Sequence, residues 1–193
     1  MAAIGISRST ISRSLRMKSI TILAVALYAV AFARLAAAPA SEPCKLPDSL
    51  QREITVKYPG AGLVTLSDLD ADDRGFFQKD HGDACPGLTK VDFYGDGEPT
   101  LALVLIAKTD AEGKAKLVVA HEVAGRWQTT VLDTADGAPV PVVWSQTSGH
   151  YTDVYGKKEI RATKPVIVLT GYESWSILYA WTGSRVAKIW LQD

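Results

Sequence analysis

The sequence predicts an α+β fold: a largely antiparallel β-sheet of meander-like hairpins, with one or two N-terminal helices packed on one face. Apolar and β-branched runs recur from Leu88 onward, and polar or Gly-rich turns separate them. The segment before Leu88 has helical rather than alternating periodicity. Helices followed by a series of hairpins are typical of this class, and we expect residues 41–193 to form a single domain.

The first helix is expected over residues 47–58. Pro47 suits a first helical turn, and Pro59-Gly60 ends the pattern. Its apolar residues recur at intervals of four, as one helix face requires. They are Leu50, Ile54 and Tyr58.

A short strand is expected at 63–66, followed by a second helix. Ser67 or Asp68 is predicted to cap this helix, which continues to about His81. The acidic residues between 68 and 73 favour the positive end of a helix over an ion-binding loop.

Seven strands are predicted after the second helix. Ala124-Gly125 and Gly183-Ser184 are suited to tight two-residue hairpin turns. The segment 133–164, rich in Gly and Pro, is expected to be mostly loop. The predicted strands are 88–94, 99–107, 115–123, 126–132, 165–171, 174–181 and 185–191.

The last hairpin has apolar residues on both faces. A turn at 183–184 pairs Trp181 with Val186, and two further pairs follow from the same register. The aromatic face either packs inside the protein, forms a ligand-binding platform or forms a subunit interface. The further pairs are Tyr179 with Lys188 and Ile177 with Trp190, and the aromatic face holds Trp175, Ile177, Tyr179, Trp181, Val186 and Trp190.

The first forty residues have the layout of a cleaved secretory signal peptide. A basic opening leads into an apolar run at 20–33, and small residues follow as far as Ala38-Pro39-Ala40. The apolar run is shorter than the about 20 residues that a membrane-spanning helix needs. We therefore expect a periplasmic or secreted protein with no integral membrane segment after cleavage; a retained anchor is the alternative.

Cleavage changes the charge of the chain. Five of its 21 basic residues and none of its 21 acidic residues lie in the first forty positions, so the mature protein has a formal charge of −5. Binding to nucleic acid or anionic lipid depends on basic patches, and neither partner is expected.

Cys44 and Cys85 are the two cysteines of the chain. In an exported protein, two cysteines predict a disulfide, with two free thiols as the alternative. No CxxC redox motif is present.

One motif points to metal binding. Residues Asp92 to Thr100 run Asp-Phe-Tyr-Gly-Asp-Gly-Glu-Pro-Thr before an apolar strand. This stretch resembles the Asp-Gly hairpin of FG-GAP-like repeats and of uncharacterised exported bacterial proteins, whose pattern is D-x-[DN]-G-D-G-x-x-D. The resemblance implies a calcium site in which Asp92 and Asp96 supply side-chain oxygens and Glu98 a backbone carbonyl.

Two ligand positions of that pattern are altered. Tyr94 and Thr100 stand where oxygen-rich side chains are expected. The alternative is an ordinary turn without a bound ion, in which Gly95 and Gly97 allow the backbone to reverse. No other cofactor is expected, because His121-Glu122 lacks the second histidine of a zinc motif.

A polar segment completes the candidate sites. Its residues lie in the expected surface loop, where binding groups are often found. These are His150, Tyr151, Asp153 and Tyr155.

Three functions follow from these observations. The first is an exported, non-catalytic structural or binding domain. The second is a calcium-stabilised adhesion or carbohydrate-contacting module that uses the Asp92 motif and the aromatic face. The third is a small exported hydrolase with acidic residues and His150.

Overall fold

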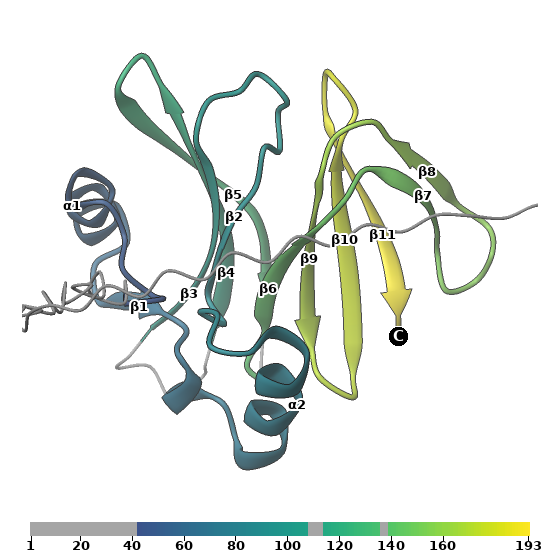
Figure 1. Ribbon diagram of the computed structural model, residues 1–193, viewed down its shortest axis with the longest axis horizontal. Helices are drawn as coiled ribbons and strands as arrows, with labels where there is room; N and C mark the ends of the chain where they lie inside the picture. The colour runs from purple at the N-terminus through teal and green to yellow at the C-terminus, as the bar shows by residue number, and fades with distance from the viewer. Residues whose placement is uncertain (1–41, 108–113, 136–138) are drawn as a thin grey trace, which may run out of the picture. The chain divides into compact units, whose positions relative to one another are not determined.

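Two antiparallel sheets and a small hairpin make up most of the computed structural model (Figure 1), which describes residues 42–107, 114–135 and 139–193. All of these residues belong to one compact unit, Ala40–Asp193. The expected signal peptide at 1–40 lies outside the described residues. The predicted combination of antiparallel sheet and N-terminal helices is confirmed, although the strands are divided between two main sheets.

In the first sheet, β3 pairs with β1, β2 and β4, and β4 pairs with β5. The second sheet has the order β11-β10-β9-β6. The first sheet contains β1 (Ala61–Leu63), β2 (Leu88–Lys90), β3 (Thr100–Ala107), β4 (Ala115–Val123) and β5 (Arg126–Ala135). The second contains β6 (Val142–Gln146), β9 (Val166–Gly171), β10 (Trp175–Trp181) and β11 (Val186–Gln192).

The register predicted for the last hairpin is confirmed. Trp181 lies opposite Val186, Tyr179 opposite Lys188 and Ile177 opposite Trp190. Both faces of the hairpin contribute residues to apolar clusters, although Trp190 on the aromatic face is 38% exposed. Tyr179 and Ile177 belong to the central core between the sheets, whereas Leu178, Ala180 and Ile189 pack on the other side.

The expectation of a loop over most of 133–164 is wrong. β5 continues to Ala135, β6 begins directly after Pro141, and a separate hairpin of β7 (Gly149–Thr152) and β8 (Glu159–Ala162) follows. Strands of four residues are too short to give a clear alternating pattern. Ile160 and Ala162 of β8 pack against the outer face of β10, which explains how the second apolar face is covered.

The two predicted helices are present, but their starts and the strand between them differ from expectation. α1 spans Asp48–Lys57 and α2 spans Ala71–His81. The strand expected at 63–66 is β1, two residues earlier, and a 3₁₀ helix, η1 (Leu66–Asp68), comes next. Asp70 caps α2, because its Oδ1 accepts the Asp73 N–H at 2.8 Å; Asp68 instead closes a capping box with Thr65 around η1.

The predicted packing of the helices on one face is not confirmed. Leu50 and Ile54 of α1 lie in an apolar cluster with Leu103 and Leu105 of β3. Phe77 of α2 belongs to the other cluster, which contains the alternate residues of β3 and the inner face of the second sheet. Because β3 is apolar on both faces, each face requires its own cover.

The predicted disulfide between Cys44 and Cys85 is present, with a Cα–Cα distance of 5.0 Å. It joins the N-terminal segment to the residues just before β2. The next residue, Pro86, accepts a hydrogen bond from the Val143 N–H of β6 at 2.8 Å, so the two sheets meet here. On their other side the sheets end at β5 and β11, and the candidate site lies there.

Candidate functional site

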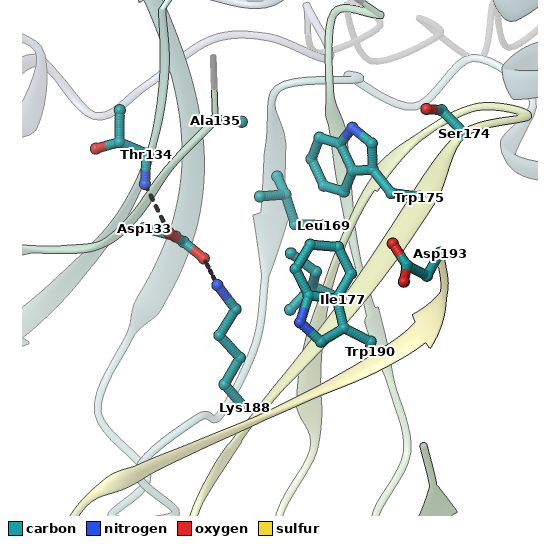
Figure 2. Close-up of a pocket in the computed structure, with 10 residues that line it drawn as sticks. All are labelled: Asp133, Thr134, Ala135, Leu169, Ser174, Trp175, Ile177, Lys188, Trp190 and Asp193. Carbon is teal, nitrogen blue, oxygen red and sulfur yellow. Dashed lines mark hydrogen bonds and ion pairs between the residues drawn. The ribbon is translucent and has the colours of Figure 1, made fainter. Parts of the chain in front are cut away.

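A cavity of about 440 Å³ opens between β5 and the β10–β11 hairpin (Figure 2). Its volume is in the range typical of small-molecule sites. Its walls combine two indoles and two aliphatic side chains with a small number of polar groups. We call it the tryptophan cavity; it is lined by Asp133, Thr134, Ala135, Leu169, Ser174, Trp175, Ile177, Lys188, Trp190 and Asp193.

Trp175 and Trp190 project into this cavity from neighbouring strands. Trp190 is 38% exposed and Trp175 is partly buried, so both indoles remain accessible to a ligand. Space for the Trp175 ring depends on Gly171, where an added Cβ would lie 2.9 Å from the indole Nε1 and 2.8 Å from Cγ of Pro139. Of the aromatic face, for which the sequence leaves internal packing, a ligand platform or a subunit interface as alternatives, Trp175 and Trp190 border an open cavity.

Asp133 provides the charged wall of the tryptophan cavity. Its Oδ2 accepts hydrogen bonds from the Lys188 ammonium and the Tyr179 hydroxyl, and its Oδ1 accepts the Thr134 N–H at 2.9 Å. Burial raises the pKa of Asp133, but these hydrogen bonds and the charge of Lys188 outweigh it and leave the pKa below its usual value. The carboxylate is thus charged at neutral pH and held in place by groups from both sheets.

Tyr179 and Lys188 complete this arrangement. Tyr179 is 1% exposed and does not line the cavity itself; its hydroxyl binds Asp133, which does. Burial, together with that hydrogen bond, raises the pKa of Tyr179 far above its usual value. The Lys188 Nζ also lies 5.5 Å from the Trp190 ring centroid, within the range of a cation–π contact.

Part of the predicted surface segment borders β11. The Tyr155 hydroxyl donates to the Asp193 carboxylate, and the Val154 N–H donates to the Trp190 carbonyl at 2.8 Å. Asp153 accepts the Lys157 N–H at 2.7 Å and closes the turn that presents Tyr155.

His150 and Tyr151 lie on β7, apart from that turn. The Tyr151 hydroxyl donates to the Thr147 carbonyl, and exposed His150 pairs in register with Arg161. Neither residue lines the tryptophan cavity.

A second cavity, of about 450 Å³, also lies along β5 and β10. We call it the polar cavity. Trp181 provides an aromatic wall here, and its ring centroid lies 5.1 Å from that of Tyr94. The cavity is lined by Tyr94, Asp96, His121, Gln128, Thr130 and Trp181.

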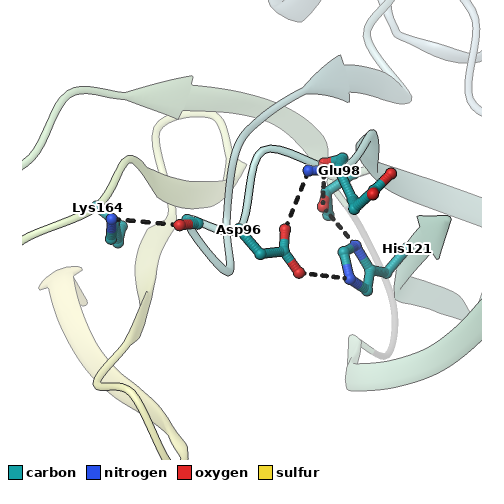
Figure 3. Close-up of polar contacts among 6 residues, drawn as sticks. Asp96, Glu98, His121 and Lys164 are labelled. Carbon is teal, nitrogen blue, oxygen red and sulfur yellow. Dashed lines mark hydrogen bonds and ion pairs between the residues drawn. The ribbon is translucent and has the colours of Figure 1, made fainter. Parts of the chain in front are cut away.

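His121 is held from two sides at the base of the polar cavity (Figure 3). Its Nε2 lies 3.0 Å from Asp96 Oδ2, and its Nδ1 lies 2.9 Å from Thr100 Oγ1. The sequence of contacts Asp96, His121 and Thr100 resembles the acid, base and hydroxyl of a hydrolase triad. Thr100, however, is 1% exposed, so no substrate can reach its hydroxyl and the chain of hydrogen bonds serves to orient His121.

In the Asp92 motif, both carboxylate oxygens of Asp96 have protein partners. Asp96 uses Oδ2 on His121 and Oδ1 on the Glu98 N–H at 3.1 Å (Figure 3). Across the described ranges, no group of three or more His, Cys, Asp or Glu side chains is arranged to hold a metal ion. The Lys164 Nζ also lies 3.4 Å from the Gly95 carbonyl, which places a positive charge beside the same turn.

No protein-family model, curated protein or solved structure matches this chain. Among the described helices, none has the length and apolar character needed to cross a membrane.

His121 stands out in the sequence only as part of an incomplete zinc motif, and Asp133 and Gln128 are site residues that sequence reasoning misses. They occur singly on strands, and no motif marks them. Lys188 differs, because the predicted register already places it opposite Tyr179. A lysine between aromatic residues on an inward face is a signal of an acidic partner, which is the partly buried Asp133 here.

Proposed function

We propose that this protein is an exported, non-catalytic binding domain that holds a saccharide ring in the tryptophan cavity. One observation carries the proposal: Trp175 and Trp190 line an open cavity beside the hydrogen-bonded pair Asp133 and Lys188. The export segment and the disulfide support a periplasmic or secreted location.

A sugar ring suits both parts of this cavity. Its C–H groups carry partial positive charge and pack well on the electron-rich face of an indole. Its hydroxyls both donate and accept hydrogen bonds, so they are complementary to a carboxylate and an ammonium group side by side. Asp133 and Lys188 neutralise each other and Asp193 adds a further carboxylate, so the cavity favours a neutral ligand over an anionic one.

The rival functions have weaker support. A hydrolase needs a reactive group that substrate can reach, but Thr100 is buried and exposed His150 makes no hydrogen bond to a carboxylate within the described residues. A calcium-stabilised module needs converging oxygen ligands, and Asp96 is already bound to His121 and Glu98.

Intrinsic tryptophan fluorescence tests sugar binding directly. The purified protein is titrated with a panel of neutral mono- and disaccharides, and at least one is expected to change the emission with saturation. Trp190→Ala should abolish that change. Trp127→Phe is the matched control, because Trp127 donates to Ser49 on the opposite face of the first sheet.

If no sugar of the panel changes the emission or binds by calorimetry, the proposal is wrong. Export is tested separately by expressing the full chain in a bacterial host and measuring the intact mass of the protein in the periplasmic fraction. The expected mass corresponds to a chain that begins near Ser41.

A further inference from the structure

We infer that the natural ligand is a linear oligosaccharide that spans both cavities, with the polar cavity as a second sugar subsite. This inference rests on the proposed function, because it assigns the first subsite to the tryptophan cavity. It adds a ligand of defined length and a binding role for residues that no sequence motif marks.

The two cavities lie along the same pair of strands. Thr130 of β5 lines the polar cavity, and Asp133, three positions along the same strand, lines the tryptophan cavity. On β10, Trp181 belongs to the polar cavity and Trp175 to the tryptophan cavity. At about 3.3 Å per residue, the backbone positions of these two tryptophans are about 20 Å apart along β10, a separation suited to a chain of rings rather than one ring.

The contact of Asp133, Tyr179 and Lys188 leaves a path for such a chain on its solvent side. Along β10, Tyr179 lies between Trp175 and Trp181, and its hydroxyl donates to Asp133, which also accepts from Lys188 of the tryptophan cavity; the Asp133 side chain is 22% exposed and that of Lys188 41% exposed. An oligosaccharide can therefore cross this bridge on its solvent side. Its hydroxyls would meet the same carboxylate and ammonium groups that serve the first subsite.

The polar cavity has the chemistry of a sugar subsite. Trp181 and Tyr94 supply aromatic surface, and the exposed side chains of Gln128 and Thr130 supply donors and acceptors. Asp96 is 46% exposed at its side chain while its contact with His121 fixes its position. Each cavity thus combines an indole with hydrogen-bonding side chains, which is the repeated pattern that a repeating ligand requires.

Ligand length and position-specific variants provide the test. Binding of β-1,4-linked glucose and N-acetylglucosamine oligomers, from the monosaccharide to the hexasaccharide, is measured by calorimetry. We expect the dissociation constant to fall about tenfold or more once the oligomer reaches Trp181, because a second ring then packs on an indole; tenfold is equivalent to about 1.4 kcal/mol. Trp181→Ala should remove this gain, so that the hexasaccharide binds no more tightly than the monosaccharide.

Gln128→Ala and Thr130→Val provide a second route, because both side chains are exposed and neither belongs to an apolar core cluster. They should weaken long oligomers selectively. Val131→Ala is the matched control on β5, since Val131 is exposed and lines neither cavity. Near-UV circular dichroism verifies that each variant is folded.

Two results would overturn this inference in different ways. If monosaccharides bind and longer oligomers bind no more tightly, the second subsite is wrong and the proposed function stands. If neither monosaccharides nor oligomers bind, the proposed function fails and this inference fails with it.

Discussion

The carboxylate of Asp133 on β5 accepts a hydrogen bond from the ammonium group of Lys188 on β11, so one ion pair joins the end strands of the two sheets. Tyr179 donates to the same carboxylate from β10. The pair is therefore part of the structure of the protein as well as a wall of its cavity.

Asp133→Asn should lower the free energy of unfolding at pH 7 by about 1–3 kcal/mol, because it removes a charged acceptor from Lys188 and Tyr179. Chemical denaturation measures this change. Asp92→Asn is the matched control, since Asp92 is exposed and lines neither site cavity, and it should leave the stability nearly unchanged.

The lowered pKa of Asp133 predicts that the stability of the protein depends on pH. The pKa of Asp133 lies below its usual value of 3.8, so the folded state favours the charged form. Its contribution is complete above about pH 5 and is lost as pH falls below 4 through the lowered pKa. Unfolding free energies measured from pH 7 to pH 3 should fall less steeply in Asp133→Asn; equal slopes would contradict this prediction.

Reduction of the Cys44–Cys85 disulfide should destabilise the protein by about 4 kcal/mol, given the loop that it closes. The measurement is denaturant unfolding with and without reductant. A double Cys44→Ala, Cys85→Ala variant should match the reduced protein and show no response to reductant. Thiol titration of the denatured, unreduced protein should find no free thiol.

Gly171→Ala should displace the Trp175 indole, because the added Cβ would lie 2.9 Å from Nε1. The expected result is a changed near-UV circular dichroism spectrum and at least about tenfold weaker sugar binding, the equivalent of about 1.4 kcal/mol. Unchanged binding would show that the position of Trp175 does not matter for the ligand.

Alanine substitutions at Gly87 and Gly75 form a matched pair of variants. A Cβ at Gly87 would lie 2.5 Å from the Val64 carbonyl oxygen and 2.7 Å from the Val64 nitrogen, whereas no atom lies within 4 Å of one at Gly75 in α2. Gly87→Ala should therefore destabilise the protein by several kcal/mol, about 3 or more. Gly75→Ala should raise the unfolding free energy by about 0.5–1 kcal/mol, and thermal unfolding distinguishes the two.

The sequence predicts the β10–β11 register because a two-residue turn at Gly183 allows a single pairing of its long strands. It does not reveal β7 and β8, whose four residues each give too little periodicity. It also does not show which element covers each face of β3, because both faces of that strand are apolar.

The residues of the two cavities are likewise only partly predictable from the sequence. Trp175, Trp181 and Trp190 are predictable as one face, because alternation along a strand fixes the direction of side chains. Asp133 and His121 are not, because their roles depend on partners far along the chain, Lys188 and Asp96. Local patterns therefore predict the aromatic walls, and only tertiary structure supplies the polar groups beside them.

Residues 85–87 give the fold one more property. Cys85 is covalently bound to the N-terminal segment, Pro86 binds β6 of the second sheet, and the Gly87 carbonyl accepts the Val104 N–H of β3 at 2.8 Å. Three consecutive residues thus connect three parts of the domain. Neither sheet can open on its own without breaking this junction, so unfolding is expected to be a single cooperative transition in which both sheets are lost together.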